Sequence, residues 1–241
     1  MAKYYLEQGV KNFLVYAGGY PFVDMHKMRT DGFIRAFEEF GITYTPGDNG
    51  NFGTFAGEGY TIDTISGFPD EAGAFWGTVG QKVGAPGVEV VISAALGVEF
   101  FGTSIAQINP AIKLGTVASF TDAYKEAINA DVPQLDYLAG KFASSIGPIF
   151  IAMLNAVTGN IESVREDGNA FRINQGYWNA VGKDQFNELY EVANSSVAPA
   201  YTADDLSQYF QLVNDSTTYA DFKAFVEAYR YEDIVKLHAD K

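Results

Sequence analysis

Aromatic and polar residues follow several apolar segments of this sequence, and their types suit ligand binding better than bond cleavage. An apolar run at 12–17 is followed by Tyr20, Phe22, Asp24 and His26. Later runs are followed by Asp48 and Asn49, by Ser93 and Leu96, and by Ser119, Phe120 and Asp122. Aromatic rings cover the apolar face of a polyhydroxyl or heterocyclic molecule, while carboxylates and amides bond to its polar hydrogens. These residues are candidates for a site that holds such a molecule.

Each candidate also has a purely structural interpretation. Tyr20 and Phe22 flank Pro21, so they are equally suited to closing a turn. Asp122 follows Ser-Phe-Thr and suits a helix cap somewhat better than a ligand contact. Trp178 follows a predicted strand and could either line a cleft or pack in a core.

The sequence lacks the common motifs of enzyme active sites. The sequence contains no phosphate-binding Gly-x-x-x-x-Gly-Lys-Ser/Thr loop, no Gly-x-Ser-x-Gly nucleophile turn and no His-Glu-x-x-His zinc motif. Residues 48–53 resemble a calcium loop only superficially, because Gly50 and Phe52 occupy ligand positions. We therefore expect a protein that is not an enzyme, with no catalytic residues, no metal and no cofactor.

Composition excludes several further classes. The chain has 241 residues, a formal charge of −14 and no Cys. Nucleic acids and anionic lipids bind mainly through Lys and Arg, so the charge argues against nucleic-acid partners. The lack of Cys excludes disulfides, thiolate metal sites and thiol nucleophiles. No apolar run reaches the length of a membrane span, and the first residues do not have the pattern of a secretion signal.

The elements that must position the candidates alternate between short apolar runs and longer amphipathic stretches. This alternation predicts an α/β fold with a parallel, doubly wound sheet. We expect strands at 12–17, 42–45, 88–93 and 112–117, and helices at 25–40, 70–83, 97–108 and 122–129. In such sheets ligands bind beyond the carboxyl ends of the strands, where the candidate residues fall. Residues 47–69 look like a long functional loop, part of which could be strand.

The second part of the chain is predicted to be mostly helical. Residues 134–139 suit either a strand or a crossing segment, and a strand is expected at 170–178. Helices are expected at 145–158, 183–193, 203–213 and 219–238. We predict an α/β lobe at 1–139, followed at 140–241 by a return segment and a helical carboxyl-terminal region that could pack on the same domain.

The order of these elements resembles the second lobe of type I periplasmic binding proteins. The resemblance lies in the run Tyr4-Tyr-Leu-Glu-Gln-Gly-Val-Lys-Asn-Phe-Leu-Val15 and in Arg29-Thr-Asp-Gly-Phe33, followed by Ala36-Phe37 and Gly41-Ile42. It continues through the runs at 88–93 and 112–117 to the segment at 140–159, and spans most of residues 3–180. The ending is most similar to solute-binding components of ABC importers, including the basic-membrane-lipoprotein type.

The resemblance implies a clamp that captures a sugar, nucleoside or similar solute outside the cytoplasmic membrane and delivers it to an ABC permease. Within it, Tyr20, Phe22 and Asp24 would stack on and orient the solute, with His26 and Asn49 close by. Arg29 would either bond to the solute or hold the lobe together, and Asp122 would bond to the solute. Phe120 would be a further ligand-binding residue, and Trp178 would line the cleft. The family's first lobe is expected to be missing from this chain, which could then form a homodimer through the vacated cleft.

Two other functions stay open on the sequence alone. The same fold serves ligand-sensing regulatory modules that act through a protein partner. A flavodoxin-like sheet also supports enzymes, for which a bound flavin would be the sign.

Overall fold

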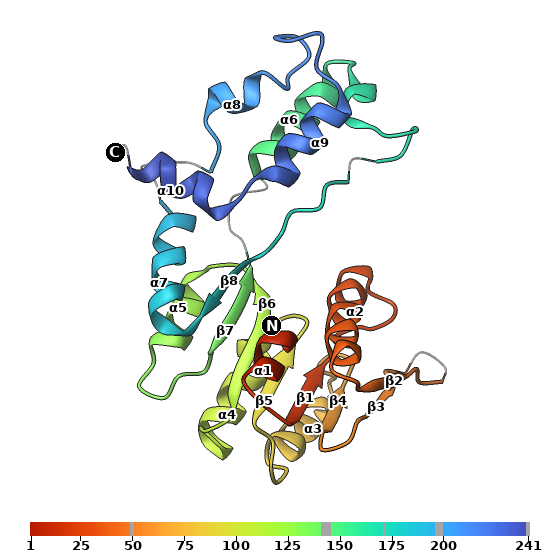
Figure 1. Cartoon of the computed structure of the whole chain (residues 1–241), viewed down its shortest axis with the longest axis vertical. Coiled ribbons are helices and arrows are strands. Elements are labelled where there is room, and N and C mark those ends of the chain that lie inside the picture. The colour runs from red at the N-terminus through yellow and green to blue at the C-terminus, as the bar shows by residue number, and fades with distance from the viewer. Residues whose placement is uncertain (49–50, 141–145, 171, 196–199, 240–241) are drawn as a thin grey trace. The chain divides into compact units, whose positions relative to one another are not determined.

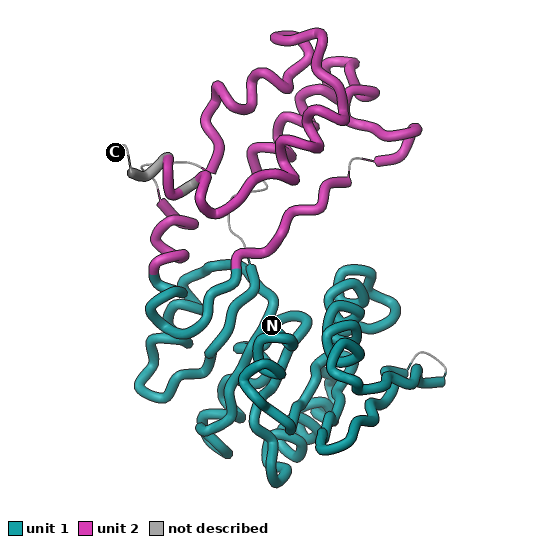
Figure 2. The backbone as a smooth tube through the Cα atoms, in the orientation of Figure 1, with its two compact units in different colours: residues 1–140, 179–187 teal, residues 141–178, 188–241 magenta. Residues whose placement is uncertain are grey.

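The computed structural model describes residues 1–48, 51–140, 146–170, 172–195 and 200–239. They divide into two compact units, coloured separately in Figure 2. Unit 1 comprises residues 1–140 and 179–187, and unit 2 comprises residues 141–178 and 188–241. Unit 1 is therefore interrupted in sequence by part of unit 2.

A six-stranded sheet forms the centre of unit 1 (Figure 1). Its strands are β1 (Asn12–Tyr16), β4 (Thr61–Ile65), β5 (Val90–Ser93), β6 (Lys113–Ala118), β7 (Tyr137–Gly140) and β8 (Trp178–Val181). They lie in the order β4-β1-β5-β6-β7-β8, and the pairs β1–β4, β1–β5, β5–β6 and β6–β7 are parallel. The first five strands have the order of a flavodoxin-like sheet. The predicted parallel α/β fold is confirmed.

Helices cover both faces of this sheet because β1 is apolar on both sides. Phe13 and Val15 face a core formed with α1 (Ala2–Glu7) and α2 (Asp24–Glu39). Tyr16 faces the other way, with its ring 6.0 Å from that of Phe75 and 5.5 Å from that of Phe101. Those rings belong to α3 (Ala74–Val83) and to the π-helical turn η1 (Val98–Gly102), which leads into α4 (Thr103–Ile108). The helix α5 (Asp122–Asn129) follows β6.

The strand predicted at 42–45 forms, but outside the main sheet. It is β2 (Thr43–Thr45), which pairs antiparallel with β3 (Thr54–Ala56) in a separate hairpin. The second strand of the main sheet in chain order is β4, inside the segment at 47–69 predicted as a long loop, part of which could be strand. β2 alternates exposed and half-buried residues, which suits a surface hairpin, whereas β5 is buried along its whole length. Asp48 therefore follows a hairpin strand, and Asn49 lies outside the described residues.

Unit 2 contains a small helical core. Its helices are α6 (Ile146–Val157), the short η2 (Ile161–Val164), α8 (Ala203–Ser207), α9 (Tyr219–Ala228) and α10 (Tyr231–Ala239). Ile151, Val164, Phe222 and Val226 form the buried centre. Thr202 with Asp205 caps α8, and Thr218 with Asp221 caps α9 in the same reciprocal way. The helix α7 (Gly182–Ala193) begins in unit 1 and ends in unit 2.

Three predicted elements of the second part differ from the structure. Among the described residues of the strand predicted at 170–178, only Trp178 is in a strand, because the backbone of residues before it bonds to side chains of α9 instead. The Tyr219 hydroxyl donates to the Arg172 carbonyl at 2.8 Å, and the Asn174 N–H donates to Glu227 at 3.0 Å. The helix predicted at 203–213 ends at Ser207, and the one predicted at 219–238 is broken at 229–230.

Neither a membrane helix nor a metal cluster is found in the described part of the chain. None of its helices is long and apolar enough to cross a membrane. Nor do three or more His, Asp or Glu residues in these ranges converge in a group that could hold a metal ion.

Candidate functional site

The candidate site lies in unit 1, at the carboxyl edge of the sheet. Chain connections run from β1 to β4 on one side, and from β5 to β6 and β7 on the other. The strand order therefore reverses between β1 and β5. In an open parallel sheet this reversal separates the loops beyond the strands and leaves room for a ligand. The segments that surround it follow β1, β4 and β5.

Hydrogen bonds hold the segments after β1 and β4 together. The Gly67 N–H donates to the Gly18 carbonyl at 2.8 Å, and the Tyr16 hydroxyl donates to the Gly67 carbonyl at 2.8 Å. The Gly19 N–H donates to Nδ1 of His26 at 3.0 Å. Gly18 has φ +59, and a Cβ there would lie 2.4 Å from that same nitrogen. The loop therefore needs glycine at this position, both for its conformation and for the space that His26 fills.

The segment after β5 is tied to α2 and carries backbone strain. Nη1 of Arg29 donates to the Ala94 carbonyl at 2.9 Å, across the point where the strand order reverses. Leu96 has φ +51, a left-handed conformation that bulky side chains rarely adopt. Such strain persists only where surrounding structure enforces it, and it is frequent at functional sites.

Exposed apolar side chains gather on these segments. Phe22 is 81% exposed in the β1–α2 loop, and Met25 and Met28 are exposed on the first turns of α2. Phe68 follows β4 and Leu96 follows β5, and both are exposed. We call these five residues the edge patch. Apolar side chains that are exposed together at one edge make this surface the candidate site of the chain.

The predicted site residues divide between this edge and other places. Tyr20, Phe22, Asp24, His26 and Arg29 all lie in the β1–α2 loop or on α2. Asp122 is exposed at the first position of α5, beyond β6. Contact of any of these six residues with a ligand stays a prediction.

Two other predicted residues are buried, which contradicts their expected place in a cleft. Phe120 has no exposed surface, and its ring packs 5.3 Å from that of Phe186. Trp178 is 5% exposed and belongs to unit 2, where its ring lies 5.8 Å from that of Tyr231. Both side chains fill hydrophobic cores.

Sequence reasoning missed part of the edge patch. Met28 matches the helical repeat that includes Phe33 and Phe37, a pattern typical of the buried face of a helix, but it is exposed. Met25 and Phe68 were not among the candidate site residues. The position of Phe68 just after a strand end is a signal that would have found it, had β4 been predicted as a strand.

His26 should make the stability of unit 1 depend on pH. Burial lowers the pKa of His26, the charge of Arg29 lowers it further, and Nδ1 must stay unprotonated to accept from Gly19. The unfolded chain takes up a proton near pH 6.5 that the folded His26 resists. The free energy of unfolding should therefore fall as the pH drops through and below 6.5.

The variant H26Q tests this dependence, because an amide oxygen can accept from Gly19 without titrating. Urea unfolding from pH 8 to pH 5 should show a flatter pH dependence for H26Q than for the original chain. Parallel curves would contradict a role for His26 titration.

Leu96 gives a second prediction. Replacing it with Gly removes the steric cost of the left-handed conformation, roughly 1–2 kcal/mol, and adds a backbone entropy cost of about 0.5–1 kcal/mol. We expect L96G to match or exceed the original stability, and the β-branched L96V to be less stable. Thermal unfolding of the three proteins checks this order. A valine variant that is more stable than the glycine variant would show that the conformation at Leu96 is not strained.

Comparisons with known proteins include a similarity to a solved structure. No protein-family model matches the sequence, and no curated protein matches it. A solved ABC transporter system solute-binding protein from Aeropyrum pernix K1 is similar to this chain with a TM-score of 0.34 and 13% sequence identity. The match covers 62% of this chain and 34% of that one, so it spans about a third of the length of the solved protein. The assignment of this chain to the flavodoxin-like α/β class rests on its own strand order.

Proposed function

We propose that unit 1 binds a small polar organic solute, such as a sugar or a nucleoside, at the carboxyl edge of its sheet, and that it does so without catalysis. The observation that carries the proposal is the edge patch. Of the large apolar side chains that are exposed in unit 1, five lie on the three segments around the reversal of strand order. Apolar surface at this place suits stacking on the flat face of a sugar or base.

Polar groups beside the patch would orient such a solute. Asp24 is exposed at the start of α2, two residues after Phe22, and its carboxylate suits a hydroxyl or amine hydrogen. The guanidinium of Arg29 is positioned by its bond to Ala94, and Asp122 is exposed beyond β6. The Tyr20 ring packs 5.1 Å from that of Phe52, so it would support the site from the side of the hairpin.

The cellular role that we propose follows the resemblance to type I periplasmic binding proteins. In that role the chain is a solute-binding component of an ABC importer, or a relative of one, located outside the cytoplasm and working with a membrane permease. The basic-membrane-lipoprotein type remains our preferred subgroup.

Titration calorimetry with ribose and adenosine as probes tests the binding proposal. We expect one of the two to bind, and F22A and D24A to weaken that binding at least tenfold without loss of folding. V132A is the matched control, because Val132 is an exposed apolar residue of unit 1 in the connection that enters the sheet at β7. The proposal fails if neither probe binds, or if F22A and D24A bind as tightly as V132A.

A protein partner is the second candidate function. Two residues of the edge patch are methionines, whose flexible side chains adapt to protein surfaces. A second copy of the chain or a regulatory partner would then cover the patch. Light scattering on the purified chain distinguishes a homodimer interface at the edge patch from a solute site there. A dimer that F22A converts to a monomer favours the interface, and a monomer that binds a probe favours the solute site.

A further inference from the structure

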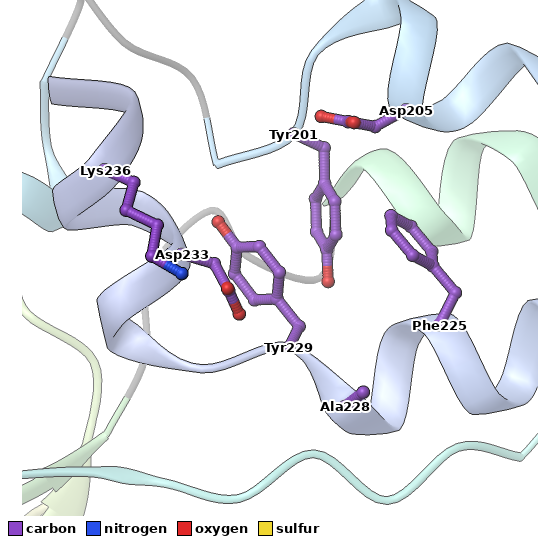
Figure 3. A pocket seen from close by; sticks show the side chains of 7 residues that line it. All are labelled: Tyr201, Asp205, Phe225, Ala228, Tyr229, Asp233 and Lys236. Atoms are coloured by element: carbon purple, nitrogen blue, oxygen red, sulfur yellow. The ribbon is translucent and has the colours of Figure 1, made fainter. Parts of the chain in front are cut away.

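Unit 2 contains a cavity of about 450 Å³ that is separate from the edge patch. It is lined by residues of α8, α9, α10, the segment before α8 and the connection between α9 and α10: Tyr201, Asp205, Phe225, Ala228, Tyr229, Asp233 and Lys236. Figure 3 shows Tyr201 between Tyr229 and Phe225, with Asp205 above Tyr201 and with Asp233 and Lys236 on the side of Tyr229. The volume is in the range of sites for small organic molecules.

Three aromatic rings form one wall of the cavity, and protein contacts fix two of them. The ring of Tyr201 lies 4.2 Å from that of Tyr229 and 5.5 Å from that of Phe225. The Tyr201 hydroxyl accepts from Nε2 of Gln175 at 3.0 Å, and the Tyr229 hydroxyl donates to the Ala200 carbonyl. Burial raises the pKa of both tyrosines, so both stay uncharged. The rings are therefore held in place as apolar surface that can attract a cation.

Two carboxylates also line the cavity, and each has an oxygen that can accept a further hydrogen bond. Oδ2 of Asp205 accepts from the Thr202 N–H at 3.0 Å, and Oδ2 of Asp233 accepts from the Arg230 N–H at 2.7 Å. Within the described residues, Oδ1 of neither Asp205 nor Asp233 accepts a hydrogen bond. A carboxylate oxygen without a protein donor is suited to bond to an ammonium group of a ligand.

The charges around the cavity favour a cation. Its lining carries two carboxylates and one ammonium, that of Lys236, for a formal balance of −1. Arg230 is next to Tyr229 in sequence, but its guanidinium donates to the carbonyls of Glu227 and Tyr229 and is not part of the lining. We infer that this cavity binds a small organic cation, an amine carried on an aromatic or apolar body. The ring wall would hold the body, and Asp205 and Asp233 would bind the ammonium group.

The probe is phenethylamine, titrated into the full chain by calorimetry at pH 7. Two molecules with the same ring and a similar length serve as comparisons: neutral 2-phenylethanol and anionic 3-phenylpropanoate. We expect phenethylamine to bind at least tenfold more tightly than either of them. Absence of phenethylamine binding, or equal binding of 2-phenylethanol, overturns the inference.

Three variants locate the binding. D205N and D233N keep an oxygen that can accept the capping hydrogen bonds but lose the charge, so each should weaken phenethylamine binding at least tenfold. K236Q removes a repelling cation and should strengthen it severalfold, which damage to the fold would not do. Unchanged affinity in D205N and D233N overturns the inference.

D221N is the matched control, because Asp221 caps α9 as Asp205 caps α8 but does not line the cavity. Its affinity for phenethylamine should equal that of the original chain. F22A should also leave this affinity unchanged, so the result is independent of the solute site proposed for unit 1. A loss of binding in D221N equal to that in D205N overturns the inference, since it would trace the effect to capping.

Discussion

Replacing Asn155 with Ala should lower the free energy of unfolding of unit 2 by about 3 kcal/mol. Asn155 is 1% exposed. Both the nitrogen and the oxygen of its side-chain amide bond to the backbone of the segment after α8. Its Nδ2 donates to the Tyr209 carbonyl at 2.8 Å, and its Oδ1 accepts from the Gln211 N–H at 2.9 Å. Each buried polar group left without a partner costs about 1–3 kcal/mol. The small core around Ile151 and Phe222 offers little to offset that loss.

Tryptophan fluorescence can assign this loss to unit 2. The chain has two tryptophans, Trp76 in unit 1 and Trp178 in unit 2. In a W76F background, the emission of the buried Trp178 should shift to the red at a lower urea concentration when N155A is added. N169A is the control, because Asn169 is exposed in the same unit and should change the midpoint little. Equal midpoints for N155A and N169A would contradict the prediction.

Replacing Phe37 with Ala should lower the stability of unit 1 by about 3–5 kcal/mol, the usual range for a buried phenylalanine. Phe37 has no exposed surface and joins three elements. Its ring lies 5.1 Å from that of Phe13 on β1 and 5.0 Å from that of Phe55 on the hairpin. Its removal leaves a cavity between α2, the sheet and the hairpin.

Hydrogen exchange measures the effect of F37A where it occurs. Amides of β1 and of α2 should exchange faster by a factor that matches the loss of stability. F22A is the same chemical change at a side chain that is 81% exposed, and it should leave these rates nearly unchanged. Similar exchange in the two variants would mean that Phe37 does not hold the three elements together.

Local sequence patterns predicted the regular part of unit 1. The apolar run at 12–17 and the β-branched run at 88–93 correspond to β1 and β5, and Asp70 accepts from the N–H groups of Ala74 and Phe75 at the start of α3. These features depend on residues close in sequence. The carboxyl edge of the sheet, where we propose the solute site, could therefore be located from the sequence.

Features that depend on distant residues could not be predicted in this way. β4 has only one fully buried residue, Ile65, so it lacks the apolar signal of an inner strand. The position of Phe120 just after a strand suggests a residue at the edge of the sheet. It is buried because its ring packs against that of Phe186, which is distant in sequence. The break between α9 and α10 coincides with Tyr229, whose ring packs on Tyr201. In each case a tertiary contact or its absence overrode the local pattern.

The interruption of unit 1 has a consequence for the order in which the chain is made. The ribosome completes β7 at Gly140, but its neighbour β8 begins only at Trp178, after residues 141–177 have been synthesised. During that interval β7 is the open edge of a nearly finished sheet, with backbone groups that can pair with another nascent chain. β7 therefore gains its neighbour only after this first segment of unit 2 has left the ribosome, and β8 then becomes the edge of the sheet.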